Sequence, residues 1–144
     1  MMVSSLPLPA TVTLPIVPFQ VPHASSIALL LLYALGVHTN PSALAVALLP
    51  LSVAEEFPSA AAMAQAMAAH CERENDASEV GSSGGGARGW QSLDRYTLYN
   101  QGIWKNVLAL GLQDSRVMSV VQTVWNVTAE SRKILARQRE RRRE

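Results

Sequence analysis

The chain has 144 residues, a formal net charge of +1 and a single cysteine, Cys71. A chain of this length makes one domain or less, and one cysteine excludes an internal disulfide and therefore a disulfide-stapled secreted scaffold. Although the net charge is close to zero, the charged residues are unevenly distributed. Residues 1–54 contain no Asp, Glu, Lys or Arg, residues 55–80 are acidic and residues 116–144 are basic.

Residues 1–25 carry five prolines, at positions 7, 9, 15, 18 and 22. Each proline fixes φ, lacks an N–H and biases the preceding residue away from helix. The spacing excludes a regular helix and predicts an extended, apolar arm. Within it, residues 11–14 are expected either to form one short strand or to lie against a partner.

The following segment, residues 26–54, is almost wholly apolar and is interrupted by a polar break at His38, Asn40 and Pro41. A spanning helix needs about 20 apolar residues. The segment is long enough for one span, whereas each half is too short. We therefore predict one kinked transmembrane helix or a short helical hairpin embedded in the membrane. An ionisable residue in such a segment is a functional candidate, but at a helix break His38 is more simply interpreted as satisfying backbone groups.

Two other interpretations explain the same lack of charge. In the first, the segment forms helices that are buried in protein within a large assembly. In the second, it is a targeting segment that is removed from the mature chain. The targeting interpretation rests on Ser52-Val53-Ala54, ahead of Glu55, whose small residues resemble a signal-peptidase site after an apolar core. Against it, no basic residue precedes that core.

Residues 55–76 predict an Ala/Met-rich helix with acidic flanks, because alanine has the best helix propensity. Met63 and Met67 lie four residues apart and share a face that suits packing on a neighbouring helix. Residues 77–89 then predict a flexible Gly/Ser linker, since this composition offers few side chains to bury.

Residues 90–144 predict amphipathic helices with a basic tail. One apolar stripe has helical spacing: Val117, Val120, Val121, Val124 and Trp125. A region of about 55 residues has too little core to be stable alone, so the stripe is expected to pack on another chain. The tail ends in a group of arginines: Arg137, Arg139, Arg141, Arg142 and Arg143. Glu140 and Glu144 are interspersed in the tail and no aromatic residue lies near it, so base stacking is not indicated. Given the predicted membrane segment upstream, a lipid surface or a protein partner ranks above nucleic acid for this tail.

No recognisable catalytic or metal site emerges from the sequence, and no cofactor is expected. The glycines of residues 84–89 have the spacing of the dinucleotide-binding motif. That motif requires a hydrophobic strand before it, and here a polar segment precedes the glycines instead. His70 and Cys71 are two metal-capable neighbours without the four ligands of a structural zinc site. No nucleophile, base and orienting group can be assembled, so the chain is not expected to be an enzyme.

The sequence therefore predicts a non-catalytic accessory or structural subunit of a multi-subunit membrane protein complex. Its partners would be other protein subunits and the lipid bilayer. An organellar inner membrane, such as that of the mitochondrion with its energy-transducing complexes, is one host that suits this architecture. Two alternatives stay open: a small secreted or lumenal helical protein cleaved after residue 54, and a protein that contacts nucleic acid through its basic tail.

Overall fold

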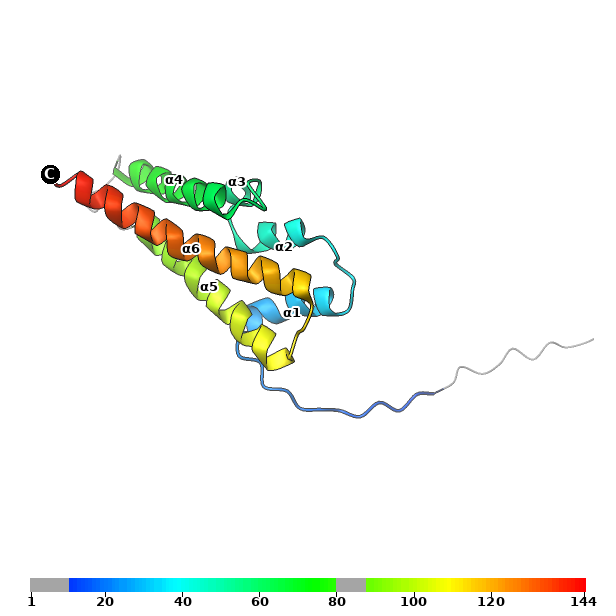
Figure 1. Cartoon of the computed structure of the whole chain (residues 1–144). Coiled ribbons are helices and arrows are strands. Elements are labelled where there is room, and N and C mark those ends of the chain that lie inside the picture. The colour runs from blue at the N-terminus through cyan, green and yellow to red at the C-terminus, as the bar shows by residue number, and fades with distance from the viewer. Residues whose placement is uncertain (1–10, 80–87) are drawn as a thin grey trace, which may run out of the picture.

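The computed structural model describes residues 11–79 and 88–144 (Figure 1). Across these two ranges the chain is mostly helical and has no strand, so the predicted mostly-α class is confirmed and the short strand at residues 11–14 is not seen. The helices in chain order are α1 (Ala24–Ala34), α2 (Pro41–Leu48), α3 (Leu51–Ala54), α4 (Ala60–Glu79), α5 (Arg88–Leu110) and α6 (Ser115–Arg141).

The three long helices, α4, α5 and α6, lie side by side, and α1, α2 and α3 pack at one end of them (Figure 1). Helices α4 and α6 run in the same direction. Ser131 of α6 donates a hydrogen bond to the carbonyl of Ala64 at 3.2 Å, and further along Arg142 lies 3.0 Å from the Glu72 carboxylate. Helix α5 runs opposite to both, with its first turn beside Asn75 of α4.

Local signals in the sequence set the ends of the helices. Asp114 caps α6, because its side chain accepts hydrogen bonds from the backbone N–H groups of Arg116 and Val117. Asn40 caps α2 in the same manner, with Pro41 at the first helical position. Gly111 ends α5 with a φ of +60°, a conformation that residues with a Cβ rarely adopt.

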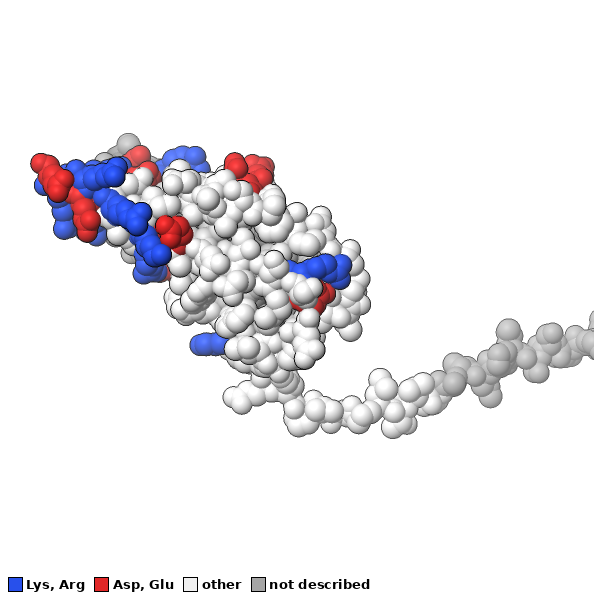
Figure 2. Space-filling view, in the orientation of Figure 1, with Lys and Arg blue, Asp and Glu red and all other residues white. Residues whose placement is uncertain are grey.

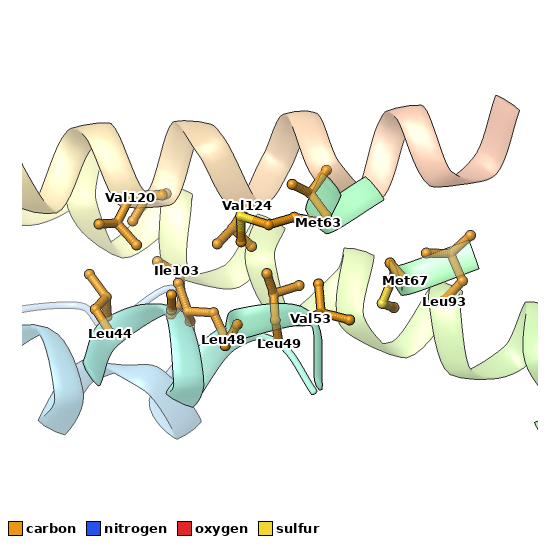
Figure 3. Packing of buried hydrophobic residues seen from close by; sticks show 14 of the residues in the cluster. Leu44, Leu48, Leu49, Val53, Met63, Met67, Leu93, Ile103, Val120 and Val124 are labelled. Carbon is orange, nitrogen blue, oxygen red and sulfur yellow. The ribbon is translucent and has the colours of Figure 1, made fainter. Parts of the chain in front are cut away.

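A single apolar core joins all six helices. Figure 3 shows side chains from the short and the long helices meeting in it: Leu44, Leu48, Leu49, Val53, Met63, Met67, Leu93, Ile103, Val120 and Val124. Each fully buried side chain of this size contributes roughly 1.5–3 kcal/mol. The stability of the long helices therefore depends on apolar residues supplied by the first third of the chain.

The predicted transmembrane helix is wrong for the described residues, none of whose helices combines the length and the apolar character needed to cross a bilayer. The apolar run is divided by the Asn40–Pro41 cap and by Pro50 into helices of 11, 8 and 4 residues. Their apolar side chains, including Leu30, pack on the rest of the chain. The inward-facing side chains of this uncharged stretch are thus buried against the protein's own long helices.

The predicted linker is shorter than expected at both ends, because α4 continues to Glu79 and α5 begins at Arg88. Residues 80–87, which include most of its glycines and serines, lie outside the described residues. The helices on either side share one core, in which Met63 and Met67 of α4 lie with Leu93 of α5. The region after the linker therefore packs with the region before it.

Candidate interaction surface

The extended segment that precedes α1, residues 11–22 and hereafter the arm, joins the helices at His23. A buried asparagine on α5 holds this junction. Asn106 Oδ1 accepts a hydrogen bond from the His23 N–H at 3.0 Å, and Asn106 Nδ2 donates to the His23 carbonyl at 2.6 Å. The same Nδ2 donates to Ser26 Oγ at 2.9 Å. Because Asn106 is fully buried, these bonds fix the position of the backbone where the arm begins.

The His23 ring occupies space that a glycine leaves open. A Cβ atom on Gly102 would lie 2.3 Å from Cγ of this ring, far closer than van der Waals contact allows. The ring also meets Tyr99 edge to face, with 5.3 Å between the ring centroids. Tyr99, Gly102 and Asn106 share one face of α5, which forms the seat for the root of the arm.

Beyond its root the arm exposes apolar side chains along its length. Ile16 is 96% exposed, and Val12, Leu14 and Val17 are also largely exposed. Figure 1 shows the arm running away from the helices. Apolar surface of this kind marks interaction sites when it is contiguous.

A second apolar surface lies on the outside of α1, α2 and α3, a region of residues 24–54 that we call the uncharged end. Its exposed side chains are Leu31, Leu32, Leu35, Val37, Val46 and Leu51. Leu35 is 76% exposed, and it follows Leu31 by one turn on the same face of the chain. Figure 2 shows that most of the charged residues gather at the opposite end of the molecule, where α4 and α6 finish, and that one acidic and basic group lies beside α2.

A third feature is an open groove of about 550 Å³ between α5 and α6. Trp125, which is 38% exposed, forms its aromatic wall, and Ala129 and Ala136 of α6 continue the surface. Thr97 and Gln101 line it from α5. The volume lies within the range of about 300–1,000 Å³ that is usual for ligand sites.

A family described as Clampless protein 1 C-terminal domain matches residues 42–144, which is more than half of the chain. The chain belongs to this family. The match covers α2 to α6, and therefore includes the α5–α6 groove and Asn106. No curated protein and no solved structure matches the chain.

In this member of the Clampless protein 1 C-terminal domain family, the valine stripe lies inside the molecule. Val117, Val120, Val121 and Val124 are buried in the core. The expectation that they pack on another chain is corrected, because α2, α4 and α5 already cover this face of α6. Only Trp125, at the edge of the stripe, keeps an exposed surface.

The predicted polar break forms the connection between α1 and α2. The Tyr33 hydroxyl donates to the Asn40 carbonyl at 2.8 Å, and the His38 ring lies 5.6 Å from the Tyr33 ring. His38 is exposed rather than set inside an apolar helix. A small pocket there is lined by His38 and Pro41 on one side and by Asp114 and Arg116 on the other.

The basic tail continues α6 as a helix up to Arg141. Figure 2 shows its cations interspersed with acidic side chains. Arg142 pairs with Glu72 at 3.0 Å, so one arginine of the predicted tail is held by α4. The structure does not bring the tail together with the arm. The arm departs from the helices next to α1, whereas the tail lies at the other end of the molecule (Figure 1).

Among the described residues no group of three or more His, Cys, Asp and Glu side chains could hold a metal ion. His70 points to Glu74, with 3.5 Å between Nε2 and Oε1. Cys71 is buried, and burial together with Glu74 and Glu72 raises the pKa of its thiol to about 11. A thiol that stays protonated at neutral pH is a poor nucleophile.

The sequence patterns did not single out His23, Gly102 or Asn106, which form the best-built polar contact in the structure. One glycine and one asparagine within a helical segment carry no periodic signal. The residues they meet lie about 80 positions away in the chain. Only a co-variation of positions 23, 102 and 106 among relatives would have indicated the contact.

Proposed function

We propose that the protein is a non-catalytic accessory subunit that docks through its uncharged end on a partner in a multi-subunit complex. The observation that carries this proposal is the exposed apolar surface of α1, α2 and α3 in a stretch without a single charged residue. A soluble surface normally collects Lys, Glu, Arg and Asp. A surface that lacks them and exposes several large apolar side chains is suited to a contact that excludes water.

The membrane setting belongs to this proposal. An uncharged, apolar surface suits a membrane-bound partner or the bilayer itself, and an organellar inner membrane remains the proposed location. Attachment would occur through the exposed surface around Leu35 rather than through a spanning helix of the described residues. Retention in the membrane fraction after a carbonate wash supports the membrane setting, and complete release contradicts it.

The alternative of cleavage after residue 54 is less compatible with the packing of the core. Removal of α1, α2 and α3 would take away Leu30, Leu44, Leu48 and Val53, which are all buried. The faces of α5 and α6 that they cover would become exposed. Intact-mass measurement of the endogenous protein separates the two possibilities, because the loss of 54 residues is unmistakable.

Site-specific photo-crosslinking in cells tests the docking. A photoreactive amino acid at Leu35 is expected to form one discrete crosslinked product with a partner chain. The matched control is Leu98 on α5, which is 65% exposed but lies outside the uncharged end. A crosslink of equal yield from both positions, or none from position 35, contradicts the proposal.

A further inference from the structure

The chain contains both a proline-rich arm and a groove with the chemistry to bind it. Pro15, Pro18 and Pro22 fix φ, and each restricts the residue before it to extended conformations. Six of the nine residues from position 14 to position 22 are therefore held close to the polyproline II conformation. Such a segment loses little conformational entropy when it binds, and grooves that contain aromatic side chains recognise it.

The periodicity of the arm favours this mode of binding. A polyproline II helix has three residues per turn. One of its edges is therefore formed by Val12, Pro15, Pro18 and Val21. A second edge is formed by Thr13, Ile16, Phe19 and Pro22. Two of the three edges are thus almost wholly apolar, and the arm has no charged side chain.

The α5–α6 groove matches a ligand of this kind. Trp125 offers an indole ring for apolar contact and an N–H that can donate to a ligand carbonyl. Both cations at the rim are already paired within the chain, Arg132 with Asp94 and Lys133 with Glu130. The groove therefore does not require an acidic ligand, and an uncharged one leaves these ion pairs intact.

The lengths also agree. From Trp125 to Ala136 the α6 wall rises through eleven residue-to-residue steps, or about 16 Å at 1.5 Å per step. A polyproline II segment advances about 3.1 Å per residue, so about five residues fill this length. Leu14–Pro18 is a five-residue stretch that contains both Pro15 and Pro18. The four residues from Phe19 to Pro22 then remain to span about 12 Å between the root and the groove.

The arm of one molecule is poorly placed to reach its own groove. Successive residues on a helix are about 100° apart, so Tyr99, Gly102 and Asn106 at the root lie on nearly the opposite face of α5 from Thr97 and Gln101 in the groove. To bind its own groove, the arm would have to turn around α5. A proline-rich segment is semi-rigid, and Figure 1 shows the arm directed away from the helices.

We propose that two copies of this chain form a dimer by exchange of arms, in which Leu14–Pro18 of each copy binds along the Trp125 groove of the other. The exchange is reciprocal, so the interface has the two-fold symmetry of most homodimers. This inference is independent of the proposed docking, because it uses neither Leu35 nor the rest of the uncharged end. The dimer therefore leaves the uncharged end free for a different partner.

Sedimentation of the full-length chain over a range of concentrations tests the exchange. The wild-type chain is expected to be dimeric. Ile16→Asp is expected to weaken the dimer about tenfold or more, because Ile16 lies on an apolar edge of the arm and a carboxylate there would lose its hydration against Trp125. Ile16 is exposed, so this variant should fold normally. Gln20→Asp is the matched control, since it adds the same charge outside Leu14–Pro18 and should leave the dimer unchanged.

A mixing experiment then shows whether binding occurs between molecules. Ala129→Glu blocks the groove but leaves the arm intact, and Ala129 is exposed on α6, so the helix tolerates the change. Each variant alone should be monomeric. Together, Ile16→Asp and Ala129→Glu should form a heterodimer with one intact arm–groove contact. A monomeric wild type, a dimer that survives Ile16→Asp, or a mixture that stays monomeric overturns the proposal.

Discussion

Replacement of Asn106 by alanine should release the root of the arm and the start of α1. The substitution removes three hydrogen bonds, two to the His23 backbone and one to Ser26 Oγ, from a site where Asn106 and Ser26 are fully buried. A typical hydrogen bond contributes about 1 kcal/mol net, and each buried group left without a partner costs about 1–3 kcal/mol. We therefore expect a loss of about 2–4 kcal/mol, a large share of the usual 5–15 kcal/mol of stability.

Urea unfolding followed by circular dichroism measures the loss, and hydrogen exchange locates it in α1. Asn106→Asp tests the directions of the bonds, because aspartate accepts from the His23 N–H but cannot donate to the His23 carbonyl. We expect it to lose nearly as much stability as the alanine variant. Asn126→Ala is the control, since Asn126 is exposed and its side chain only accepts from Gln122. If Asn106→Ala changes neither the unfolding midpoint nor the exchange of α1, the role assigned to Asn106 is refuted.

Three further outcomes follow from the packing. Gly102→Ala should destabilise the fold by about 1–3 kcal/mol because its Cβ would overlap the His23 ring, and an unchanged melting temperature contradicts that contact. Asn100→Leu should stabilise the fold by about 1 kcal/mol, since both buried amide atoms lack a hydrogen-bond partner among the described residues; a loss of stability in urea would indicate a hidden partner. The Cys71 thiol should resist thiol reagents until the chain unfolds. Its pKa is raised from about 9 to about 11, so its contribution to stability is complete below pH 9 and is lost as the pH rises towards 11. Cys71→Ala should reduce the slope of stability against pH in this interval.

The helical class followed from periodicity and alanine content, which are local properties of the chain. The Met63 and Met67 pair was expected to face a neighbouring helix, and both residues lie in the core. The transmembrane helix was predicted because an uncharged apolar run has the same composition in lipid and in a protein core. The break at Asn40–Pro41 was visible in the sequence. The sequence did not show that α5 and α6 offer an apolar surface on which the short helices on either side of the break can pack.

The valine stripe shows the same limit of prediction from sequence. Its spacing predicted an apolar face on α6, and that face exists. The spacing alone does not reveal which neighbour covers it. The assumption that residues 90–144 stand apart excluded α2 and α4, which both pack on α6. The seat of the arm was missed for a different reason, since it depends on a single glycine and a single asparagine far in sequence from His23.

Native-gel analysis of the tagged, full-length protein at its endogenous level tests the proposed subunit role most directly. The protein would be extracted in mild detergent, and the wild type would be compared with Leu35→Glu. We expect the wild type to migrate in a large complex of fixed stoichiometry, and the variant to run at the mass of this chain or its dimer. A wild-type chain that itself runs only as a monomer or dimer would contradict the role of accessory subunit.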